Sequence, residues 1–117
     1  MSRPKRVRGS DKDRRLIETF LDMMSAERGA SPNTLEAYRR DLLDFAEHCG
    51  REACDLAGAN RENVRAYLAC LSDAALKASS QARKSSALRR FYGFLYGEGI
   101  RRDDPCGAVA APRLSRP

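Results

Sequence analysis

The chain has 117 residues, of which 42% are hydrophobic and 32% charged, and this size and composition favour a single folded domain. It holds no apolar stretch of about 18 residues, the length of a membrane span. The N-terminus also lacks the apolar segment that a secretory signal needs. We therefore expect a cytoplasmic protein that neither crosses a membrane nor is secreted.

The residue types that most often carry chemistry are scarce. Four cysteines show neither the CxxC pairing of a zinc site nor the density of a disulfide framework, so we interpret them as reduced, partly buried thiols. The one histidine, His48, lies among polar positions and is predicted to be exposed. A single histidine removes most metal sites and most Ser/His or Cys/His schemes. We expect no catalytic residue, no metal site and no cofactor in this chain.

The positive charge is unevenly distributed. The net charge is +6, and residues 1–15 (+5) and 77–102 (+6) carry the excess, while residues 16–76 hold six basic and eleven acidic groups and are net −5. Segregated positive charge indicates an anion-binding face, for which nucleic acid is the commonest partner.

The first half of the chain predicts two helices. Residues 1–10 are charged and lack periodic apolar positions, so we expect a disordered basic arm. Apolar residues at helical spacing predict a helix over about 12–28, closed by Gly29. The cap residues of the turn at 31–34 then start a second helix over about 33–49, which Gly50 is expected to end.

The second half predicts two more helices and no strand. A helix over about 61–75 follows Asn60, its expected N-cap, and another over about 80–97 follows cap oxygens from Ser79 and Ser80. We predict an all-α, compact four-helix bundle, with residues 11–104 as the domain. Residues 105–117, rich in proline and small side chains, are predicted to form a linker toward a further domain.

The fourth predicted helix carries the stronger candidate surface. Arg83, Ala87 and Arg90 share one row on the helical wheel, with Lys84 at the edge of the apolar face. The N-terminus of this helix suits a phosphate because its N–H groups and positive dipole end attract anions. The candidate contacts in this segment are Lys77, Ser79, Ser80, Arg83, Lys84, Ala87 and Arg90.

The second predicted helix offers a similar surface. Its outward row includes Asp41, and Arg39 lies nearer the apolar stripe, where we expect it to brace the fold. Three acids share the exposed side, so plain solvated surface is the alternative interpretation. The candidate contacts in this segment are Ser31, Asn33, Thr34, Ala37 and Arg40.

Three strings in this order resemble a known family: Arg28-Gly29-Ala30-Ser31-Pro32-Asn33-Thr34-Leu35-Glu36-Ala37-Tyr38-Arg39-Arg40-Asp41-Leu42, then Ser79-Ser80 with Arg83 and Ser86-Ala87-Leu88-Arg89-Arg90-Phe91-Tyr92-Gly93-Phe94-Leu95, then Asp103-Asp104-Pro105. They are similar to the N-terminal core-binding domain of bacterial tyrosine recombinases, most of all the Xer type that resolves chromosome dimers. The likeness covers about residues 14–115.

This resemblance implies a SAM-like helical domain that clamps duplex DNA together with a C-terminal catalytic domain. In such domains the second and fourth helices face adjacent major grooves, which here points to Thr34, Ala37, Arg40, Ser79, Ser80, Arg83, Ala87 and Arg90. The family's nucleophilic tyrosine and His-x-x-Arg signature are expected beyond Pro117. We therefore expect this chain to be monomeric alone, to bind double-stranded DNA without cutting it, and to meet other recombinase protomers on DNA.

Two other interpretations are weighed beside this one. A helical protein-interaction module would use its basic face to dock an acidic partner and would show no salt-sensitive DNA binding. A stand-alone helix-turn-helix regulator would need a short turn between its helices, whereas roughly ten residues separate the second and third predicted helices.

Overall fold

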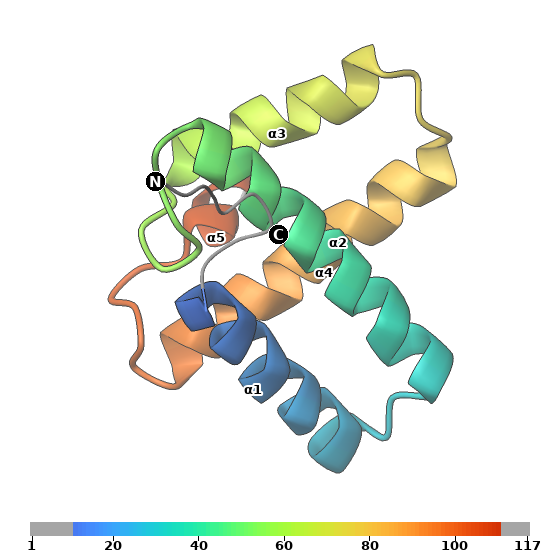
Figure 1. Cartoon of the computed structure of the whole chain (residues 1–117), viewed down its shortest axis with the longest axis vertical. Helices are drawn as coiled ribbons and strands as arrows, with labels where there is room; N and C mark the ends of the chain where they lie inside the picture. Colours follow the sequence, from blue (N-terminus) through green and yellow to red (C-terminus); the bar gives the residue numbers. More distant parts are fainter. Residues whose placement is uncertain (1–10, 111–117) are drawn as a thin grey trace, which may run out of the picture. The chain divides into compact units, whose positions relative to one another are not determined.

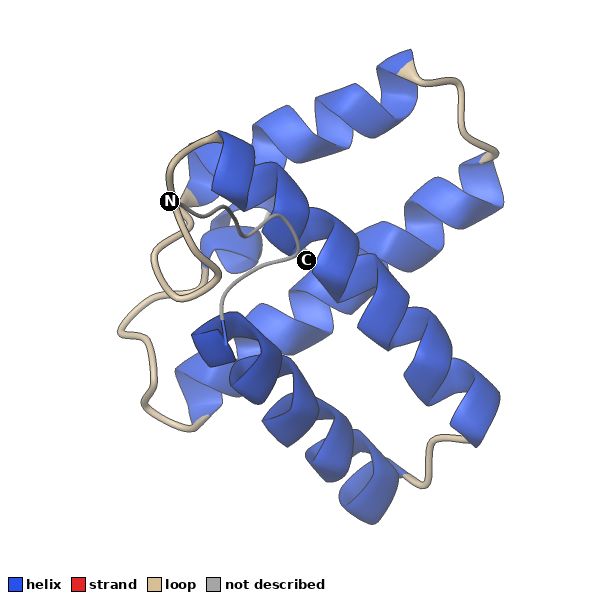
Figure 2. Ribbon diagram, viewed as in Figure 1, coloured by secondary structure: helices blue, strands red, loops and turns tan. Residues whose placement is uncertain are grey.

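A computed structural model of the chain describes residues 11–110, and in this part helices joined by loops are the regular structure, with no strand (Figures 1 and 2). The all-α prediction is confirmed. In residues 11–110 no helix is apolar over a long enough stretch to cross a membrane. Within the same range no three His, Cys, Asp or Glu side chains gather as metal ligands. The predicted basic arm over 1–10 lies outside the described residues.

The chain divides between Gly58 and Ala59 into two compact units. Unit 1 comprises the described residues up to Gly58, and unit 2 comprises those from Ala59 on. The four long predicted helices are present, two in each unit.

Unit 1 is a helical hairpin of α1 (Asp11–Arg28) and α2 (Pro32–Arg51), which lie side by side in Figure 1. Gly29 ends α1 as predicted, and it takes φ +62°, a left-handed conformation that costs glycine little. The Ala30 N–H donates to the Met24 carbonyl (3.1 Å) and closes the turn. The apolar faces of both helices are buried, and Phe20 lies 6.2 Å from Tyr38 between ring centroids.

The loop after α2 is tied back to the first turn of α1. The Asp13 carboxylate is buried and accepts the Leu56 N–H at 3.1 Å, a contact across 43 residues of sequence. The Ala53 backbone takes φ +61° next to the helix end, and the Cys54 N–H donates to the Cys49 carbonyl at 2.9 Å. These bonds satisfy backbone groups that the end of a helix leaves open.

Two predictions about α2 are wrong. The helix continues through Gly50 to Arg51 rather than ending at the glycine. His48 is buried, not exposed, and its ring stacks on Phe45 with centroids 6.1 Å apart. Phe45 and His48 are three positions apart and so share a face, and the buried stripe is wide enough to include the imidazole.

Unit 2 contains α3 (Arg61–Asp73), α4 (Ala78–Gly97) and the short α5 (Pro105–Ala110). Asn60 caps α3 as predicted, because its side chain accepts the Asn63 N–H at 3.0 Å while the Asn63 side chain accepts the Asn60 N–H at 2.9 Å. The turn into α4 places Ala75 at φ +59°. Each of these three helices contacts the other two.

The helix α5 occupies the first part of the segment predicted to be a linker. Asp104 caps it by accepting the N–H groups of Cys106 (2.9 Å) and Gly107 (3.0 Å), and Pro105 fills the first helical position, where a missing N–H costs nothing. Pro105 and Cys106 are buried. Residues 105–110 are therefore part of unit 2, and residues 111–117 lie outside the described residues.

Candidate nucleic-acid interface

The predicted contacts fall into two groups, five in unit 1 at the N-terminal half of α2 and seven in unit 2 between Lys77, the N-cap of α4, and Arg90, just past the middle of that helix. Two consecutive arginines occur in each helix, Arg39 and Arg40 in α2 and Arg89 and Arg90 in α4. The two groups differ in how each helix begins and in how their basic side chains are bound.

The α2 helix begins with a capped turn. Ser31 is the N-cap, its Oγ accepts the Thr34 N–H at 3.2 Å, and Pro32 follows at the first helical position. The Ser31 hydroxyl also donates to the Thr34 Oγ1 at 3.0 Å. Ser31, Asn33 and Thr34 are all exposed. The hydroxyls that were predicted to meet a phosphate thus already hold the first turn together.

The two consecutive arginines of α2 have different surroundings. Arg39 forms ion pairs with Glu18 of α1 and Glu36 of α2 at 2.8 and 2.7 Å, so it braces the hairpin as predicted. Its hydrogen bond to Glu18 lowers the pKa of that carboxyl below its ordinary value. Arg40 is exposed and, among residues 11–110, makes no ion pair or side-chain hydrogen bond.

The outward row of α2 is narrower than the helical wheel predicts. Asp41 is buried with only 2% of its surface exposed, which corrects its placement in that row, and Ala37 is half-buried. Asp41 lies four residues before the buried Phe45 and thus on the same side of the helix, so the covered face extends beyond the apolar stripe. Arg40 and the first turn remain as the exposed part of the predicted α2 surface.

The α4 helix begins without a side-chain cap. Its N-cap is Lys77, and Ser79 and Ser80 lie inside the first turn, so the prediction that their hydroxyls cap the helix is wrong. The reason is that the helix starts at Ala78, about two residues earlier than the spacing of apolar residues indicated. The loop before it is held instead by the Gln81 amide, which donates to the Leu76 carbonyl at 2.8 Å.

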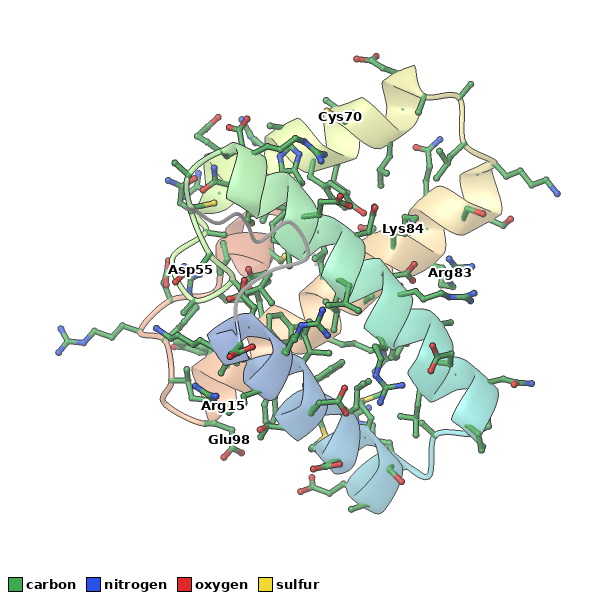
Figure 3. The ribbon with its side chains drawn as sticks, in the orientation of Figure 1. Arg15, Asp55, Cys70, Arg83, Lys84 and Glu98 are labelled. Carbon is green, nitrogen blue, oxygen red and sulfur yellow. The ribbon has the colours of Figure 1, made fainter. Side chains whose placement is uncertain are left out.

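The basic side chains of α4 occupy its surface. Arg83 is exposed and Lys84 half-buried, and both extend from the N-terminal half of the helix in Figure 3. Arg89 donates to the Ser85 Oγ at 2.9 Å, a neutral partner one turn earlier. Arg90 is exposed and, within the part of the chain that the structure describes, has no ion pair or side-chain hydrogen bond.

One predicted contact of α4 is corrected by the structure. Ala87 is 0% exposed, so its methyl group belongs to the buried face instead of lying between Arg83 and Arg90 on a surface. Leu88, Phe91 and Tyr92 are buried beside it, and a small residue at the margin of such a face is readily covered. A helical wheel gives the direction of a side chain but not the width of the covered face.

One basic residue of the segment 77–102, Arg101, makes its contacts within unit 2. The Arg101 guanidinium lies 5.2 Å from the centre of the Tyr92 ring and pairs with Asp103 at 2.9 Å. It also donates to the Ala59 carbonyl across 42 residues of sequence, and its side chain is 8% exposed. Arg101 therefore stabilises unit 2 and does not add to an anion-binding surface.

All four cysteines are free thiols, as predicted. Burial raises the pKa of the Cys49 thiol well above its ordinary value and that of Cys106 to about 12. Cys70 is exposed on α3 (Figure 3). The two buried thiols thus stay protonated at neutral pH, which is the state of a structural cysteine.

Comparison with known proteins identifies the class. Residues 17–99 match the family described as phage integrase, N-terminal SAM-like domain, and the chain belongs to this family. The resemblance to the N-terminal domain of tyrosine recombinases is confirmed.

Individual relatives support the same family assignment. The chain is 51% identical over 100 residues to a tyrosine recombinase XerD of Rhizobium meliloti, with 86% of this chain and 32% of the relative covered. It is 46% identical over 110 residues to a XerD of Bradyrhizobium diazoefficiens (94% and 35% covered) and 45% identical over 100 residues to one of Caulobacter vibrioides (86% and 33%). The chain spans about a third of the length of these relatives.

Proposed function

We propose that this chain is the DNA-binding N-terminal domain of a site-specific tyrosine recombinase and that it binds duplex DNA through the N-terminal half of α2 and through α4 as far as Arg90. The observation that carries the proposal is the charge of α4, which holds four basic residues and no acid, a net +4. Its Arg83 and Arg90 are exposed. A helix with this charge and an uncapped N-terminus attracts a polyanion, and phosphate contacts dominate the affinity of such surfaces.

The family supports the same role. The relatives are tyrosine recombinases named XerD, and they are about three times as long as the segment that matches this chain. We propose that residues 11–110 act as the DNA-binding part of such a protein, and that strand exchange needs a catalytic domain C-terminal to it. The whole protein would then act with other protomers on DNA, with chromosome dimer resolution as its role.

A titration tests the proposal. Amide NMR shifts of the labelled chain are followed as a duplex with a dimer-resolution-type core site is added at about 50 mM and about 200 mM salt, and again with a scrambled duplex. We expect shifts at residues 31–41 and 79–90 and a dissociation constant that is roughly micromolar at the lower salt and weaker at the higher. A difference between the duplexes measures how much sequence this domain reads.

The contrary outcome is equally clear. If the amide shifts stay unchanged at about millimolar DNA, well above the usual range for nonspecific binding, the proposal fails. The alternative would then be a helical module whose basic face docks an acidic protein. That module would form a saturable protein complex without salt-sensitive DNA binding.

A further inference from the structure

Three side chains form a charged network on the hairpin of unit 1. The Arg39 Nε and Nη2 donate to the two carboxylate oxygens of Glu18 at 2.8 and 2.9 Å, and its Nη1 donates to Glu36 Oε1 at 2.7 Å. The Glu18 pair is bidentate and joins α1 to α2, whereas the Glu36 pair lies within α2. Bidentate pairing of a guanidinium with a carboxylate fixes both groups in direction as well as distance.

The position of Glu36 matters for its other neighbour, Arg40. The two residues are four apart on one helix, with the acid on the N-terminal side, which is the spacing and order that favour a salt bridge. Positions 32–38 of α2 hold no other basic residue, so Arg39 and Arg40 are the two guanidiniums of this helix within reach of Glu36. In the part of the chain that the structure describes, Glu36 pairs with Arg39 and Arg40 has no ion pair.

We propose that Arg39 is a positioning residue for DNA binding, which holds the Glu36 carboxylate and so keeps Arg40 available to a DNA phosphate. The inference rests on the proposed function, since it concerns the same α2 surface. Arg39 donates three of its five N–H groups to two carboxylates, and in this proposal it is not itself the DNA contact. Without Arg39, Glu36 both pairs with Arg40 and repels the phosphates that approach the first half of α2.

The state of the network in the free protein agrees with this role. The hydrogen bond from Arg39 lowers the pKa of Glu18 and raises that of Arg39, so both stay charged around neutral pH. Glu36 is 56% exposed in its side chain and therefore free to turn toward another partner if Arg39 is removed. Exposed pairs are individually weak, and a change of partner costs little.

A double-mutant cycle on duplex DNA tests the inference. We expect Arg39→Gln to weaken binding about fivefold at about 50 mM salt, and Arg39→Gln with Glu36→Gln to restore affinity to within about twofold of wild type. Glu36→Gln alone is expected to change affinity by less than about twofold because Arg39 already neutralises this carboxylate. Arg51→Gln, which removes the same charge from an exposed arginine at the far end of α2, controls for net charge and should cost less than about threefold.

Two results would overturn the inference. If Glu36→Gln improves affinity equally with and without Arg39, the carboxylate repels DNA regardless of its partner. If the double variant stays as weak as Arg39→Gln, Arg39 contacts DNA itself or is needed only for the fold. The Glu18→Gln variant distinguishes a direct DNA contact of Arg39 from a purely structural role. A purely structural role predicts that Glu18→Gln loses as much affinity and as much melting temperature as Arg39→Gln.

A measurement without DNA keeps this test separate from that of the proposed function. The Arg40 Nε–H signal is followed by NMR in the free protein, where Arg39→Gln should shift it and the added Glu36→Gln should return it. An unchanged signal contradicts the change of partner even if DNA binding is confirmed. A shifted and restored signal together with no DNA binding in wild type refutes the proposed function and leaves the ion-pair exchange standing.

Discussion

The consecutive arginine pairs of α2 and α4 are alike in that, within residues 11–110, only the first arginine of each pair is bound by other side chains. In each pair the first arginine is bound within its own unit, Arg39 to Glu18 and Glu36 and Arg89 to Ser85. The second, Arg40 or Arg90, makes no ion pair or side-chain hydrogen bond in the described part of the chain. The partners differ in charge, however. Carboxylates cancel the charge of Arg39, whereas a hydroxyl leaves that of Arg89 intact.

The net charges of the two helices differ in the same sense as the partners of Arg39 and Arg89. The α2 helix has three arginines against four acids and is net −1, while α4 has four basic residues and no acid. The α2 helix also begins with a Ser31 cap, and α4 begins with no side-chain cap. In the proposed interface α4 would therefore supply most of the attraction for an anion, while α2 is the more firmly held structural element, with Arg40 as the exposed arginine of its N-terminal half.

The largest expected effect separates the two helices by DNA affinity. Replacing Arg83 and Arg90 with alanine together should weaken duplex binding about a hundredfold, because each contact is worth roughly 1–3 kcal/mol if it reads a base edge. Arg40→Ala in α2 should cost only about threefold to tenfold. Fluorescence anisotropy over a salt series measures both, and the salt slope should fall by about 0.9 for each phosphate that a variant no longer neutralises. Arg65→Ala on α3 is the control, and an Arg40→Ala loss as large as that of the α4 variant contradicts the ranking.

Both units bury a thiol, Cys49 in α2 and Cys106 in α5, and alkaline pH should destabilise the protein through them. The pKa of Cys106 is raised to about 12 from an ordinary 9.0, so the folded state keeps a proton that the unfolded chain loses. Stability is therefore complete below about pH 9 and falls above it, by about 1.4 kcal/mol per pH unit for each such thiol. Urea unfolding from pH 8 to 10.5 measures the slope. The Cys106→Ala variant should lose one thiol's share of it, and an unchanged slope contradicts the prediction.

The helix starts differ in a way that stability measurements resolve. Ser31→Ala removes the acceptor of the Thr34 N–H and should destabilise the protein by about 1 kcal/mol. Ser79→Ala, in the first turn of α4, should change the free energy of unfolding by less than about 0.5 kcal/mol, since its hydroxyl caps nothing. Denaturant melts of both variants test the contrast. Equal losses would show that α4 depends on a serine cap after all.

The smallest effect concerns the turns that lead into the two helices. The turn before α2 places Gly29 at φ +62°, and the turn before α4 places Ala75 at φ +59°. Ala75→Gly relieves the strain of a side chain in the left-handed region but adds freedom to the unfolded chain, so we expect a gain of at most about 1 kcal/mol. Gly29→Ala should instead destabilise by about 1 kcal/mol. Thermal melts compare the two, and a loss for Ala75→Gly contradicts the strain argument.

Local signals in the sequence determined much of this protein. The long helices, the Gly29 turn and the Asn60 cap follow from residues within one or two turns of each other, and the family follows from strings of the same kind. The α5 helix was missed because Pro-rich composition indicates a linker, although Asp104-Pro105 is also a helix start. The hydrogen bond from Arg89 to Ser85 joins residues four apart on one helix, a spacing that can be read from the sequence.

Only the tertiary structure decided which edge residues are covered and which distant charges meet. Ala87, Asp41 and His48 lie at the margins of apolar faces, and periodicity predicts the centre of such a face but not its width. Arg39 donates to Glu18, which lies 21 residues away in the sequence, and Arg101 donates to the Ala59 carbonyl, which lies 42 residues away. These long-range contacts depend on how the helices pack within each unit, so the partners of Arg39 in α1 and of Arg101 at Ala59 could not be predicted from their places in the sequence.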